Sequence, residues 1–134
     1  MNNLNIVVAM LEDMVARDIY TKMSSGTKKR LDSKMRRFKK RGKVSEDYTL
    51  IDVIKKFITP ICYVSGQEFF WNKCSLFSFD HVVPVSKSRN SNLNNLQIME
   101  KKLDAIKDKH PIGSLLVIMK KIVEKEKKEC YIIL

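Results

Sequence analysis

The chain has 134 residues, a formal net charge of +11, 44% hydrophobic residues and 31% charged residues. This length suits one compact domain, and the apolar fraction is too high for an intrinsically disordered chain. No apolar run approaches the ~20 residues that span a bilayer, and the N-terminus lacks the basic region of a secretory signal, so we expect a cytoplasmic protein without membrane contact. Three cysteines without a Cys-x-x-Cys pair favour neither a disulfide framework nor a structural zinc site.

The positive charge is concentrated in residues 27–43, which hold ten basic residues and one acid, Asp32, and so nine of the eleven net charges. Like charges in such a run repel one another, which favours a polyanionic partner. We expect DNA, most simply a duplex, to be that partner. The candidate DNA-binding residues are Lys28, Lys29, Arg30, Lys34, Arg36, Arg37, Lys39, Lys40 and Arg41, and outside this segment Arg89 and Lys107.

Apolar residues at helical spacing predict three helices in the first 60 residues. The first covers residues 4–23 and is amphipathic. The second runs from about Thr27, as N-cap, to Arg41, and the third begins after Thr49, which forms a capping-box pattern with Asp52, and ends before Pro60. The apolar stripe of the second helix consists of Leu31, Met35 and Phe38.

From residue 61 onward, aromatic and β-branched residues predict short strands at 61–64, 67–71 and 76–85, with a Ser65-Gly66 turn. A loop rich in Ser and Asn follows at 87–94, and a helix is predicted from Asn94 or Asn95 to about Lys107. A further helix covers 111–129, and the tail 130–134 is apolar and unassigned. We therefore expect one α+β domain, with helices in 1–60, a strand and helix core in 61–110 and a C-terminal helix and tail in 111–134.

Four residues in this core suit phosphodiester hydrolysis. Asp80 and Asp104 could hold a hard divalent cation such as Mg²⁺, which prefers oxygen ligands and keeps water positions open for a phosphate. His81 could act as general base near neutral pH. Asn95 could hydrogen-bond backbone across the loop and orient His81. Alternation along the strand places Asp80 and His81 on opposite faces unless the strand bends near Pro84.

The order of these residues resembles the HNH endonuclease family, whose members are also called ββα-metal nucleases. That pattern has an Asp-His pair, a Pro, a Ser, an Asn-Leu pair, and an Asn or His followed by Lys. The spacings of 14 residues from His81 to Asn95 and of nine from Asn95 to Asp104 resemble those in the HNH domains of CRISPR effector nucleases. The segment CYVSG at 62–66 also resembles an opening hairpin of phage and bacterial HNH proteins, and the similarity covers roughly residues 27–124.

The resemblance implies a ββα-metal core in which Asp80 and Asp104 bind one Mg²⁺ or Mn²⁺, His81 is the general base and Asn95 orients it. It also implies DNA cleavage that leaves 5′-phosphate and 3′-hydroxyl ends. The sequence departs from the family in having Asp104 at the usual Asn or His position and Ser88-Arg89 where Gly-Gly is common. A monomer would nick one strand, whereas a homodimer could cut both. The alternative is a non-catalytic nucleic-acid-binding protein with a degenerate HNH site.

Overall fold

The structure, a computed structural model, describes residues 3–103 and 123–126. Its N-terminal part contains the helices α1 (Asn3–Lys22), α2 (Ser25–Lys40) and α3 (Leu50–Lys56). The three predicted helices are confirmed, and the predicted capping box at Thr49 and Asp52 is present at the start of α3. The predicted N-cap of α2 was wrong, because Ser24 accepts the hydrogen bond from the backbone N–H of Thr27 and the helix therefore begins earlier.

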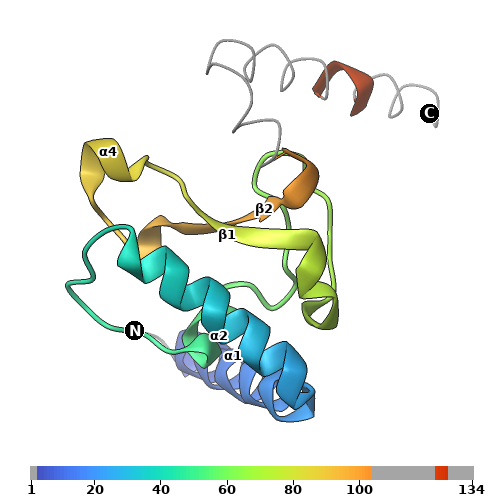
Figure 1. Cartoon of the computed structure of the whole chain (residues 1–134). Helices are drawn as coiled ribbons and strands as arrows, with labels where there is room; N and C mark the ends of the chain where they lie inside the picture. The colour runs from blue at the N-terminus through green and yellow to red at the C-terminus, as the bar shows by residue number, and fades with distance from the viewer. Residues whose placement is uncertain (1–2, 104–122, 127–134) are drawn as a thin grey trace.

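Within the described residues, the sheet consists of β1 (Phe77–His81) and β2 (Leu96–Glu100), which pair antiparallel. The register sets Phe77 opposite Glu100 and His81 opposite Leu96. A 3-10 helix, η1 (Trp71–Leu76), leads into β1, and the connection to β2 contains the short helices α4 (Val85–Ser88) and η2 (Leu93–Asn95). The chain therefore mixes helices with an antiparallel strand pair, and α2 lies across that pair (Figure 1).

The prediction of a helix starting at Asn94 or Asn95 was wrong, because residues 96–100 form β2 and helical backbone begins only at Lys101. Pairing with β1 supplies the backbone hydrogen bonds here, and this tertiary contact overrides the local helical spacing. The predicted strands at 61–64 and 67–71 were also wrong, since these segments contribute isolated bridges, between Ile61 and Glu68 and between Cys62 and Ile98. Strand β1 ends at His81, four residues before the predicted end.

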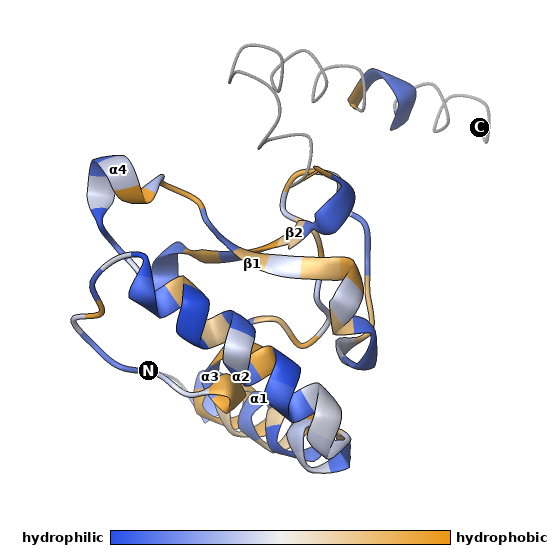
Figure 2. Cartoon of the chain, in the orientation of Figure 1, coloured by the Kyte–Doolittle hydropathy of each residue, from blue (hydrophilic) through white to orange (hydrophobic). Residues whose placement is uncertain are grey.

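The core lies between α2, α3 and the strands, where apolar surfaces face one another (Figure 2). The predicted stripe of α2 is buried, as are the inward residues of α3 and of both strands. The largest contributors are Leu31, Phe38, Val53, Ile54, Phe77, Leu96 and Ile98. By contrast, most of the apolar residues that define α1 are exposed, and Ala16 is its one buried residue. In the described part of the chain, no helix is long and apolar enough to cross a membrane.

Substitutions in β2 distinguish its strand register from the predicted helix. Ile98 is fully buried, whereas on a helix with Leu96 and Met99 facing inward it would lie off the apolar face. We expect Ile98→Ala to lower the free energy of unfolding by about 2–5 kcal/mol, and Gln97→Ala, on the neighbouring half-buried residue, by less than about 0.5 kcal/mol. Urea denaturation measures both values, and a small loss at Ile98 would contradict the strand.

Candidate functional site

His81 is the last residue of β1, and its side chain is directed at α2. The imidazole stacks on the Phe38 ring, with 3.9 Å between ring centroids and 12° between planes. Only 4% of the residue is exposed. Its Nε2 atom lies 2.9 Å from the hydroxyl oxygen of Ser91, in the connection between the strands. The ring is thus fixed on one face by an aromatic contact and at one nitrogen by a hydrogen bond.

The hydrogen bonds of Ser91 decide which nitrogen of His81 carries the proton. Ser91 is fully buried, and its hydroxyl donates to the Phe38 carbonyl oxygen at 3.0 Å. A hydroxyl has a single proton, so in the bond to His81 the Ser91 oxygen is the acceptor and Nε2–H is the donor. The neutral ring then carries its lone pair on Nδ1, the nitrogen that can accept a proton.

The backbone around Ser91 is held by contacts with the segment that follows α2. Its N–H donates to the Lys43 carbonyl oxygen at 2.9 Å, and the Tyr48 hydroxyl donates to its carbonyl oxygen at 2.8 Å. The N–H of Lys43 in turn donates to the Arg89 carbonyl oxygen at 2.6 Å. The C-terminal end of α2 and the loop that carries Ser91 therefore form one hydrogen-bonded unit.

Asn95 makes the backbone hydrogen bonds across the loop that its position predicts. Its Oδ1 accepts from the Val83 N–H at 2.9 Å, and its Nδ2 donates to the carbonyl oxygens of Val83 at 3.1 Å and Asn90 at 2.7 Å. The residue is buried and closes the segment between β1 and β2 at its base. It thereby fixes the chain on both sides of the loop that holds Ser91 against His81.

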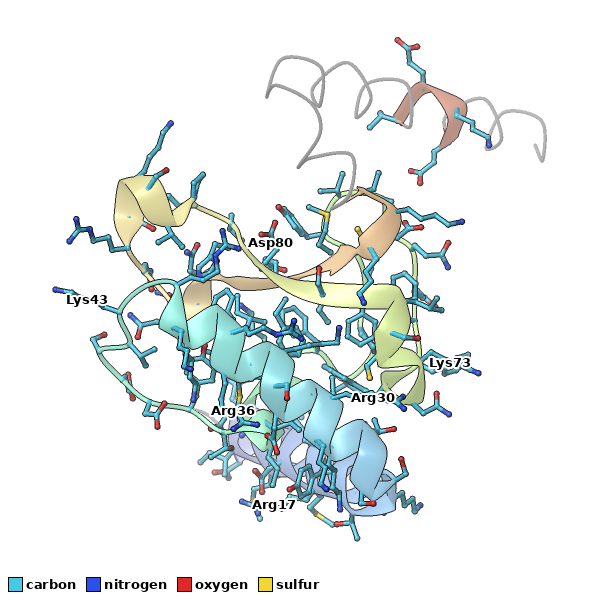
Figure 3. The ribbon with its side chains drawn as sticks, viewed as in Figure 1. Arg17, Arg30, Arg36, Lys43, Lys73 and Asp80 are labelled. Carbon is cyan, nitrogen blue, oxygen red and sulfur yellow. The ribbon has the colours of Figure 1, made fainter. Side chains whose placement is uncertain are left out.

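Asp80 lies on the other face of β1, as strand alternation predicts. Asp80, labelled in Figure 3, is 8% exposed, and its Oδ2 accepts a hydrogen bond from the Tyr63 hydroxyl at 3.1 Å. A carboxylate is a suitable oxygen ligand for Mg²⁺ or Mn²⁺, and such ions need only one or two protein carboxylates. Among the described residues, no three His, Cys, Asp or Glu side chains form a cluster that could hold a metal. Asp104 and Lys107, two further predicted site residues, lie outside the described residues.

The basic residues predicted to bind DNA are distributed over several faces of α2 and do not all have the same surroundings. Lys39 is engaged within the protein: its ammonium group contacts Asp47 Oδ1 at 2.8 Å and the Tyr48 carbonyl oxygen at 2.6 Å. Lys28 lies over the Tyr20 ring. Of the cations on α2, Lys39 alone forms an ion pair with a described residue. The exposed members are Lys29, Arg30, Arg36, Arg37, Lys40 and, just beyond the helix, Arg41.

A hollow of about 290 Å³ opens beside His81, between α2 and β1. Its lining includes the imidazole together with cations of α2 and of the chain after β2. These cations are Lys34, Arg37, Arg41 and Lys101. An anion in this hollow would therefore lie next to His81 and be surrounded by positive charge.

Arg89 is exposed on the loop and adopts a left-handed conformation, with φ of 51°. This conformation favours glycine, which is the residue type that the resembled family often has there. Sequence reasoning did not identify Ser91 or Tyr63 as site residues. Ser91 lies in a loop without a motif, Tyr63 lies in the CYVSG segment but has no role predicted for it there, and each is recruited by a long-range contact. Comparisons of the chain with protein-family models, with curated proteins and with solved structures found no match.

The close approach of the loop to Gly42 gives one prediction. A Cβ at this position would lie 2.5 Å from Ser91 Oγ and 2.6 Å from the Arg89 carbonyl oxygen. We expect Gly42→Ala to push the loop away from His81 and to lower the free energy of unfolding by about 1–3 kcal/mol. Gly26→Ala is the matched control, because the nearest atom to its Cβ is 4.0 Å away. If thermal denaturation found the two variants equally stable, the tight contact at Gly42 would be refuted.

The Tyr48 hydroxyl gives a prediction on pH. Burial, and secondarily the negative charge of Asp47, raises the pKa of Tyr48 to about 12. Because the pKa is higher in the folded protein than the value near 10 of the unfolded chain, the associated stability is complete below pH 10 and is lost as the pH rises toward 12. We expect the wild type to exceed Tyr48→Phe by about 1 kcal/mol at pH 8 and to lose this advantage above pH 10. Urea denaturation at several pH values tests this, and a difference independent of pH would contradict it.

Proposed function

We propose that the protein is a metal-dependent DNA endonuclease that hydrolyses phosphodiester bonds with His81 as general base. The observation that carries this proposal is the state of the imidazole. Its Nε2–H is fixed by Ser91, its lone pair is on Nδ1, and the ring lines a hollow with four cationic side chains. A base in a fixed tautomer beside a site for anions is what the activation of water next to a phosphate requires.

In the proposed reaction, His81 accepts a proton from the attacking water. Ser91 and Phe38 keep the imidazole from rotating, and Asn95 keeps the loop that bears Ser91 in place. Asp80 and Asp104 would hold one Mg²⁺ or Mn²⁺ ion, which would stabilise the charge that develops on the phosphate oxygens. Because Asp80 and His81 lie on opposite faces at the end of β1, the cleaved phosphate would have to bind across that end of the strand. The Tyr63 hydroxyl orients the Asp80 carboxylate through its hydrogen bond. Proton transfer of this kind contributes about 10²–10⁴-fold to a rate.

The cationic surface of α2 supports DNA as the substrate. Its cations outnumber their described acidic partners, and their attraction to phosphates does not depend on base sequence. The same surface also fits the alternative of a DNA-binding protein without catalytic activity. The endonuclease would cleave a bound strand, whereas the non-catalytic protein would leave it intact.

A nicking assay on supercoiled plasmid with Mg²⁺ or Mn²⁺ tests the proposal. We expect the wild type to convert the plasmid to the open-circular form, and His81→Ala to reduce this rate by at least about 100-fold. Lys73→Ala is the control, because Lys73 is an exposed cation in η1, at the other end of β1 from Asp80 (Figure 3). Equal nicking by wild type and His81→Ala would refute the assignment of the base. Plasmid binding without nicking would support the non-catalytic alternative.

A further inference from the structure

Two neighbouring hollows along α2 share the same cationic side chains. The hollow beside His81, of about 290 Å³, adjoins one of about 410 Å³ that extends toward the start of α2 and η1. Lys34, Arg37 and Lys101 line both. Together the two hollows form one groove, which we call the α2 groove, and its cations are Lys29, Arg30, Lys34, Arg37, Arg41 and Lys101.

The spacing of these cations matches an extended polyanion. Arg30, Lys34, Arg37 and Arg41 follow one another at intervals of four, three and four residues, which places them along one side of the helix. At 1.5 Å per residue they cover about 16 Å, which equals the axial rise of about five base pairs of a DNA duplex. The row ends beside His81, so a strand in the α2 groove would lead to the proposed base.

The centre of the α2 groove brings two ammonium groups together. Burial lowers the pKa of Lys34, and repulsion from Lys101 lowers it further. Lys34 is half-buried on α2, whereas Lys101 comes from the chain just after β2, so the folded structure imposes this proximity. None of the described residues that line the groove is acidic. An acidic hollow with Glu46, Asp47 and Asp52 lies elsewhere on the surface.

We propose that Lys34 and Lys101 together bind one phosphate group of a nucleic-acid strand in the α2 groove, adjacent to the phosphate that is cleaved. A phosphodiester carries one negative charge shared by two non-bridging oxygens, so each ammonium group can donate a hydrogen bond to one oxygen of the same phosphate. Arg37 also lines both hollows and adds positive charge beside this lysine pair. The inference rests on the proposed function only for the position of the cleaved phosphate; binding by the lysine pair is independent of cleavage.

Binding of a fluorescent oligonucleotide without divalent metal tests the pair, measured by fluorescence anisotropy at several salt concentrations. Single-stranded and duplex forms are both used. We expect Lys34→Gln and Lys101→Gln each to raise Kd about five- to tenfold. The double variant should reduce the slope of log K against log salt by nearly one, because the pair neutralises one phosphate. The double variant should lose less than the product of the two single losses, because both lysines bind one phosphate. Lys73→Gln, at an exposed lysine of η1 that lines neither hollow, should change Kd less than twofold.

Thermal denaturation separates this effect from unfolding. Removing one of two ammonium groups that repel each other should leave the stability unchanged or raise it, so weaker binding by a stable variant reports a lost phosphate contact. Equal effects of Lys73→Gln and Lys34→Gln, or independent losses in the double variant, would overturn the proposal. If the lysine pair binds DNA but wild type does not nick plasmid, the endonuclease proposal fails and the phosphate site stands. If wild type nicks plasmid but Kd is unchanged in both single variants, the phosphate site fails and the endonuclease proposal stands.

Discussion

A serine hydroxyl has one proton to donate, and in this protein the proton of Ser91 is directed at the carbonyl oxygen of Phe38. The hydroxyl oxygen is then available to His81 only as an acceptor, which fixes both the orientation and the tautomer of the imidazole. The backbone of Ser91 is held in turn by hydrogen bonds with Lys43 and Tyr48. The orientation of the proposed base thus depends on how the C-terminal end of α2 docks on the loop between β1 and β2.

Helix α2 connects the fold to the proposed chemistry. Its apolar residues, including Phe38, pack into the core and support His81. Its cationic residues on the neighbouring side line the α2 groove that ends at the same imidazole. A single helix therefore contacts the proposed base and carries most of the cations that we propose bind phosphate. Much of the positive charge of the chain thus lies on the helix where we propose that nucleic acid binds.

The sequence was informative wherever the controlling interactions are local. Helical spacing and the Thr49–Asp52 capping box predicted α3, and Leu31, Met35 and Phe38 predicted the buried stripe of α2. Alternation predicted opposite faces for Asp80 and His81, and the amide chemistry of Asn95 predicted its bonds to loop backbone. The metal ligand set that would include Asp104 stays a prediction, since that residue lies outside the described part of the chain.

Prediction failed where distant contacts decide the structure. Leu96 and Met99 have helical spacing and lie on opposite faces of a strand, where they join different core clusters. Only pairing with β1 selects the strand. Nothing local marks Ser91 among the serines and asparagines of its loop, because its partners are 10, 43, 48 and 53 residues away in sequence. The proximity of Lys101 to Lys34 likewise follows from the packing of α2 beside the strands.

The protonation of the His81 ring nitrogens is the most direct test of this account. Long-range ¹H–¹⁵N correlation spectra of the imidazole, recorded above the pH at which the ring is charged, distinguish the protonated nitrogen from the one with the lone pair. The account predicts a proton on Nε2 and a lone pair on Nδ1 in the wild type, with this preference weakened in Ser91→Ala. A proton on Nδ1 in the wild type would contradict it.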